Sequence, residues 1–121
     1  MANTFKVANF AAEPASAGTP YVMYTIAGST TGVVLGLILT NIHTSAVTAE
    51  VELVSTTSNR SVANNTANGT SFLVKDVSIP AGSSLEILSG GKVVLETGDV
   101  LRIDCSVADK LSGTLSLMEI T

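Results

Sequence analysis

His43 is the only histidine in the 121-residue chain, and it lies in the polar segment 41–45, which is typical of a turn. A histidine that acts as a general base or binds a metal needs partner side chains beside it. No second histidine exists, and the single cysteine lies far away in the sequence. We therefore predict that His43 is an ordinary, exposed turn residue.

Cys105 is the other candidate for chemistry, because a thiolate is a nucleophile and a metal ligand. It shares the parity of Leu101, Ile103 and Val107 in an alternating apolar segment, so we expect its side chain to point inward. A thiol buried among aliphatic side chains has a raised pKa and is inert. Cys105 is therefore predicted to be a core residue.

Motifs for metal, phosphate or acyl chemistry are not supported by their spacing. The acidic set comprises Asp76, Asp99, Asp104 and Asp109, and it lacks the alternating oxygen ligands of a calcium loop. Calcium binding would require these carboxylates to converge in the fold. Residues 97–99 and 90–92 are better explained as turns, since the latter lack the residues and the following helix of a phosphate loop. No Gly-X-Ser-X-Gly is present. We predict no enzyme activity, no catalytic, cofactor-binding or metal-binding residues, and no cofactor.

Composition and charge exclude further classes of function. Charged residues make up 13% of the chain, about half the usual ~25%, and the net charge is −4. The six Lys and Arg are scattered singly, which argues against nucleic acid as a partner. The most apolar run, residues 33–42, is far shorter than the ~20 residues of a membrane-spanning helix. No signal peptide is evident at the N-terminus, and the single cysteine suits synthesis in a reducing cytosol.

Short apolar runs with a period of two recur along the chain, separated by Gly, Pro, Asn and Ser. The predicted strands cover residues 4–10, 21–26, 31–42, 47–53, 72–79, 85–88, 92–96, 100–107 and 111–120. This spacing predicts an all-β fold, a single-domain β-sandwich or jelly roll of about eight or nine short antiparallel strands. Residues 1–20 are expected to form an N-terminal arm and loop, and residues 21–121 the sandwich.

One predicted strand is apolar on both faces. In residues 33–42 the alternation places Val33, Leu35, Leu37 and Leu39 on one face and Val34, Ile38 and Ile42 on the other. Apolar side chains on both faces indicate burial on both sides, so one face should be covered by another subunit or a loop. The candidate interface residues are Val34, Ile38, Ile42, Phe5 and Phe10.

Residues 55–70 form a long polar segment rich in Asn, Ser and Thr. A loop of this length is often a binding loop or a projection. Three Asn-X-Ser/Thr triplets occur around it, but glycosylation requires a secretory route that nothing in the sequence indicates. The candidate exposed residues of this loop are Asn59, Arg60, Asn64, Asn65 and Asn68.

Two stretches resemble small virion proteins of tailed phages, notably those that infect cyanobacteria. The first is YVMYTIAGSTT followed by GVVLGLILTNI, over residues 21–42. The second is FLVKDVSIPAGSSLEIL at 72–88, leading into KVVLETGDVL at 92–101. The resemblance is a pattern of strands and turns over most of residues 21–120, ending in the acidic-aliphatic pair Glu119-Ile120. It carries no catalytic residues.

The resemblance implies a structural role in the virion. We expect a capsid decoration or cement protein that bridges major-capsid subunits, forms a homo-oligomer (a homotrimer is favoured) and contacts the major capsid protein or other virion proteins. The alternative is a tail, neck or fibre-associated module that contacts host glycans through residues 55–70. A lytic enzyme is the third hypothesis, and it would require His43 for activity.

Overall fold

The computed structural model describes residues 2–55, 69–88 and 90–121, and these ranges form nine strands. The strands are β1 (Asn3–Glu13), β2 (Tyr21–Thr25), β3 (Thr31–Asn41), β4 (Val47–Ser55), β5 (Gly69–Ile79), β6 (Ser84–Glu86), β7 (Val93–Leu95), β8 (Val100–Cys105) and β9 (Leu111–Ile120). Each coincides with a segment that the period-two pattern predicts, and the bounds differ by a few residues. Within the described ranges, no helix has the length and apolar character needed to cross a membrane.

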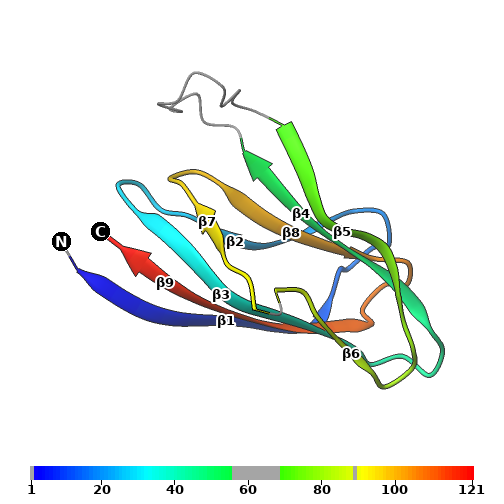
Figure 1. The fold of residues 1–121 in the computed structure, drawn as a ribbon. Coiled ribbons are helices and arrows are strands. Elements are labelled where there is room, and N and C mark those ends of the chain that lie inside the picture. Colours follow the sequence, from blue (N-terminus) through cyan, green and yellow to red (C-terminus); the bar gives the residue numbers. More distant parts are fainter. Residues whose placement is uncertain (1, 56–68, 89) are drawn as a thin grey trace.

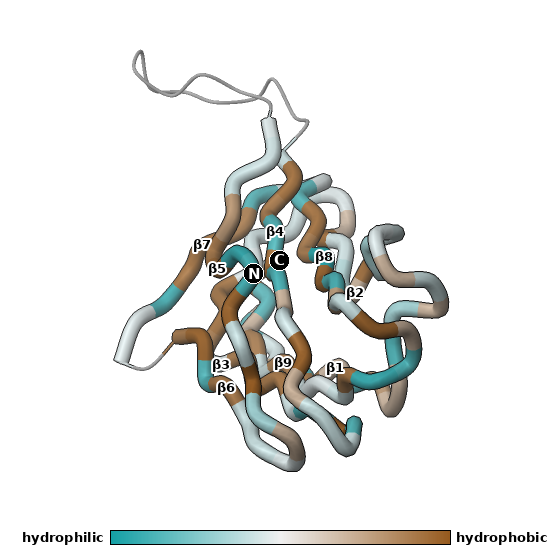
Figure 2. The backbone as a smooth tube through the Cα atoms, turned by 90° about the vertical axis from the view of Figure 1, so that its right-hand side faces the viewer, coloured by the Kyte–Doolittle hydropathy of each residue, from teal (hydrophilic) through white to brown (hydrophobic). Residues whose placement is uncertain are grey.

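The strands form two antiparallel sheets packed face to face (Figure 1). Sheet A has the order β1-β9-β3-β6, with β7 also paired to β3, and sheet B has the order β2-β8-β4-β5. Figure 2 shows β1, β3, β6 and β9 of sheet A lying below β2, β4 and β8 of sheet B, with the two termini side by side. The fold is therefore an all-β sandwich, as the sequence predicts.

The chain crosses between the sheets at most connections, so most paired strands are distant in sequence, with the consecutive pair β4 and β5 as an exception. β6 and β7 lie on the same edge of sheet A, because β6 pairs with residues 38–40 of β3 and β7 with residues 32–34. Gly90, which has a φ of 75°, lies between them. Counted as one interrupted strand, they complete the eight-strand order of a jelly roll.

The core lies between the sheets and consists almost entirely of aliphatic side chains. In β4, Val47, Ala49 and Val51 are buried, while in β8 Leu101, Ile103 and Cys105 are buried. Both sets follow the predicted alternation, and the inward position of Cys105 is confirmed. The free thiol is 3% exposed.

The predicted alternation of residues 33–42 is wrong beyond Val34. The register of β3 against β9 shifts between Val34 and Gly36, which leaves Leu35 as an extra residue in a β-bulge. Val34 points inward with Leu37 and Leu39, and these three side chains are 1%, 0% and 0% exposed. A one-residue insertion exchanges the two faces of every residue that follows it.

Residues 1–20 do not form a separate arm. β1 pairs with β9 along its length, from Asn3 opposite Ile120 to Glu13 opposite Leu111. Phe10 is buried and packs edge-on against Tyr21, with ring centroids 5.2 Å apart. These contacts make β1 an edge strand of the sandwich, and only the segment between β1 and β2 is a loop.

Asn41 ties the end of β3 to two neighbouring turns. Its side-chain Nδ2 donates hydrogen bonds to the carbonyl oxygens of Ser45 and Ile79, each at 2.9 Å. Its Oδ1 accepts a hydrogen bond from the backbone N–H of His43 at 2.7 Å. The residue is fully buried, and its amide is satisfied by backbone groups.

Candidate interaction surface

His43 lies apart from the other residues with potential chemistry, whereas Asp76, Asp104 and Cys105 line one hollow. His43 lies in the bend after β3, and its side chain is half-buried rather than fully exposed as predicted. Among residues 2–55, 69–88 and 90–121, no group of three His, Cys, Asp or Glu side chains is placed to hold a metal ion. Of the acidic set, Asp99 and Asp109 lie in separate turns, whereas Asp76 of β5 and Asp104 of β8 line one hollow.

Two of these carboxylates hold the backbone in place. In the turn 96–99 the Asp99 carboxylate accepts a hydrogen bond from the backbone N–H of Glu96 at 2.9 Å, and Gly98 has a φ of 86°. This confirms the predicted turn. The Asp104 carboxylate accepts hydrogen bonds from the backbone N–H groups of Gly18 and Cys105, at 3.2 and 2.8 Å. It lines a shallow hollow of about 200 Å³.

A polar cluster that the sequence did not reveal lies between the sheets at the edge where β1 approaches β2. The Lys6 Nζ is 2.7 Å from one Glu119 carboxylate oxygen, and the Tyr24 hydroxyl donates a 2.7 Å hydrogen bond to the other. Glu119 is 5% exposed. Hydrogen bonds from Lys6 and then Tyr24 hold the pKa of Glu119 below its ordinary value. Burial, reinforced by the bond to Glu119, raises the pKa of Tyr24.

These shifts do not suit acid–base catalysis. A general base works best with a pKa near the working pH, whereas the pKa of Glu119 is moved away from neutrality. The pKa of Lys6 is raised by its hydrogen bond to Glu119, which strengthens its charged form. The cluster therefore acts as a polar bridge that joins β1 and β9 of sheet A to β2 of sheet B.

The outer face of sheet B is charged. A row of directly paired residues crosses its four strands in the order Val22, Arg102, Glu52 and Phe72. The two central residues form an ion pair in which the Arg102 guanidinium donates to one Glu52 carboxylate oxygen, with a Nε–Oε2 distance of 3.0 Å. A second ion pair joins Lys75 to Glu50 at 3.0 Å. This face is typical of a surface in contact with water.

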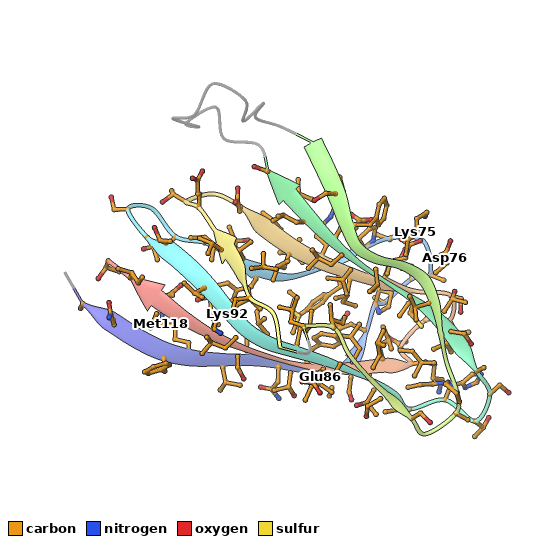
Figure 3. The ribbon with its side chains drawn as sticks, in the orientation of Figure 1. Lys75, Asp76, Glu86, Lys92 and Met118 are labelled. Carbon is orange, nitrogen blue, oxygen red and sulfur yellow. The ribbon has the colours of Figure 1, made fainter. Side chains whose placement is uncertain are left out.

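The corresponding row on the outer face of sheet A is uncharged. It crosses four strands in the order Phe5, Met118, Val33 and Val94. Phe5 and Val94 are 74% and 61% exposed. Figure 3 shows Met118 on β9 in the lower sheet, on the side of the molecule away from Lys75 and Asp76 of β5. The two sheets thus differ in the charge of these rows, and the row of sheet A lies near one end of β1, β3 and β9.

We define the apolar face as the outward-pointing apolar side chains of sheet A, which are Phe5, Val7, Val33, Leu35, Ile38, Val94 and Met118. Among the described strands of sheet A, Glu86 of β6 is the one charged residue in an outward position, since Lys6 and Glu119 bind each other between the sheets and Glu13 pairs with the inward-pointing Leu111. The exposed Lys92 lies directly before β7. Charge depletion with exposed aromatic and Met side chains distinguishes the centre of a protein interface. The apolar face is therefore the candidate functional surface.

The predicted interface residues divide between core and surface. Phe5, Ile38 and Ile42 are 74%, 44% and 48% exposed, so they remain candidates. Val34 and Phe10 are buried at 1% and 7% exposure, and they cannot contribute to a surface. Val34 is buried because the β3 bulge places it on the inner face with Leu37 and Leu39. Phe10 is buried because it pairs with Gly113 of β9, which turns its ring into the core. The predicted loop residues 59, 60, 64, 65 and 68 lie outside the described residues.

Sequence reasoning missed Val33, Met118 and Val94 as surface residues. Gly36 was the available signal, because a glycine inside a strand often marks a bulge. No local signal places Met118 beside Val33, since their strands are separated by most of the chain.

Comparison with known proteins does not identify a family. No protein-family model matches the sequence, and no curated protein matches it. Among solved structures, a chain described in connection with Bacillus endospore appendages, which form disulfide-linked pili, aligns with a TM-score of 0.49 at 16% identity. The alignment covers 99% of this chain and 87% of that chain. A likeness at this level supports no inference about function.

Proposed function

We propose that the chain is a structural, non-catalytic protein of a tailed-phage particle, a capsid decoration protein that bridges and stabilises major-capsid subunits. The observation that carries the proposal is the contrast between the charged outer face of sheet B and the apolar face of sheet A. A chain that must remain soluble rarely leaves a contiguous apolar patch uncovered unless the patch is an interface.

The jelly-roll strand order agrees with this role by analogy, because viral capsid domains use it, although lectins and cupins use it as well. The resemblance of residues 21–101 to virion proteins supplies the phage context. The mechanism is mechanical: each bridge between capsid subunits resists the outward pressure of the packaged DNA. Many copies on one particle add avidity to a modest interface.

The decisive experiment compares particles with and without the protein. We expect particles that lack it to release DNA at a lower temperature, and we expect added wild-type protein to restore the normal release temperature. Val94→Glu, in the apolar face, should fail to restore it, whereas Val22→Glu, at the matched edge position of sheet B, should succeed. Unchanged DNA release together with recovery of the protein in purified tails would overturn the head assignment in favour of a tail or fibre module.

A further inference from the structure

We propose that the apolar face of sheet A packs against the same face of a second copy of this chain, about a two-fold axis parallel to the strands. The inference deepens the proposed function by naming what covers the apolar face. A two-fold dimer also presents two copies of each remaining surface of the protein, and a bridge between two capsid subunits needs two equivalent surfaces.

The size of the face suits this partner. The whole outer face of sheet A is four strands wide and up to 11 residues long, which gives about 19 Å by 36 Å, or roughly 700 Å², from the usual strand spacing and rise. Its fourth strand position is filled by the three-residue β6 and β7, and the apolar face occupies part of this area. A standard protein interface buries ~800 Å² on each side. Two sheets pack face to face within about 30° of parallel.

The order of side chains along the rows makes the face complementary to itself. A two-fold axis that lies between β9 and β3 and runs parallel to the strands places each row opposite the same row of the partner, with the order of its residues reversed. Phe5 then meets the partner's Val94, and Met118 meets the partner's Val33. Each contact therefore pairs a larger side chain with a smaller one.

The one charge in an outward strand position fits the same arrangement. A second row crosses sheet A in the order Asn9, Thr114, Ile38 and Glu86. Reversal of this row places Glu86 opposite the partner's Asn9, whose amide can donate a hydrogen bond to the carboxylate. The alternative is a two-fold axis that runs along this row, perpendicular to the strands. Such an axis would place Glu86 opposite the partner's Glu86, and the two like charges would repel each other.

Cysteine cross-linking tests both the pairing and its axis. Phe5 and Val94 of one chain lie three strand spacings apart, about 14 Å, so a shorter bis-maleimide cannot join them within a chain. We expect Phe5→Cys/Val94→Cys to give a covalent dimer and each single variant to give none. The native thiol of Cys105 is buried and leaves the background low. A dimer from Phe5→Cys alone, or none from the double variant, overturns the proposed axis.

Sedimentation of the isolated protein tests the face. The wild type should be a dimer, and Val94→Glu should raise its dissociation constant by roughly tenfold to a hundredfold through an unpaired buried carboxylate. Val22→Glu should leave the constant unchanged. A monomeric or trimeric wild type, or equal effects of the two variants, overturns the inference. Both experiments use the isolated protein and no phage particles. A protein that dimerises in them but is absent from virions would therefore refute the proposed function and leave the proposed pairing intact.

Discussion

Removal of the Asn41 amide should destabilise the fold more than removal of any exposed hydrogen bond. In Asn41→Ala the buried Ile79 carbonyl loses its donor, which costs ~1–3 kcal/mol. The Ser45 carbonyl and the His43 N–H are only partly buried, so water can replace their bonds at a cost of about 0.5 kcal/mol each. The expected loss is therefore ~2–4 kcal/mol, a large fraction of the ~5–15 kcal/mol typical of a domain.

Urea unfolding followed by circular dichroism measures this loss as a change in midpoint at constant slope. Thr40→Val is the matched control, because Thr40 precedes Asn41 in β3 and its hydroxyl makes only an exposed 3.1 Å contact with the Ser84 hydroxyl of β6. Its effect should stay within ~0.5 kcal/mol. An Asn41→Ala variant as stable as this control would refute the assigned role of the amide.

Asn41→Asp separates the hydrogen bonds from the volume of the side chain. The substitution keeps the acceptor for His43 but turns a carboxylate oxygen toward the carbonyls of Ser45 and Ile79. At neutral pH it should be less stable than Asn41→Ala, because a buried carboxylate that faces two carbonyl oxygens costs more than a missing group, even with the His43 N–H as a donor. It should regain stability as the pH falls and the carboxyl becomes protonated. Equal stability of the two variants at neutral pH would contradict this geometry.

Three further outcomes follow from single contacts. Gly113→Ala should lower stability by ~1–3 kcal/mol, because its Cβ would lie 2.5 Å from the Phe10 ring, and Phe10→Leu in the same chain should recover part of the loss; additive losses in denaturant midpoints would contradict this. The pKa of Glu119 is held below the ordinary 4.5, so the ionised carboxylate stabilises the folded state above that pH, and this stabilisation is lost as the pH falls through the folded pKa. The difference in unfolding free energy between wild type and Glu119→Gln should therefore narrow in acid. A difference that is constant with pH would argue against the Lys6 contact. Cys105 should react with a thiol reagent only at the rate of unfolding, and rapid labelling of the native protein would show that the thiol is accessible.

Local pattern was sufficient for the secondary structure of this chain. Alternating β-branched and aliphatic residues predict the strands, and Gly, Pro, Asn and Asp mark the turns, because both depend on backbone geometry within a few residues. The inward position of Cys105 follows from the same period of two. The two-sided apolar character of β3 is accompanied, within the described residues, by exposure of Leu35 and Ile38.

Residue by residue, that surface was not predictable. The β3 bulge at Leu35 exchanges inward and outward positions, and its energy depends on pairing with β9, which lies about 80 residues later in the chain. Residues 1–20 look like an arm until β9 provides a partner for β1. The Lys6–Glu119–Tyr24 cluster joins three strands from opposite ends of the chain.

The sequence by itself therefore determined which residues form strands and where the main turns lie. Only the tertiary structure decided that the charged outward residues gather on sheet B while sheet A presents Phe5, Met118, Val33 and Val94 as one row. The physical reason is that sheet neighbours in a jelly roll come from distant segments. The character of a face is then a property of strand order and register, which no local sequence pattern contains.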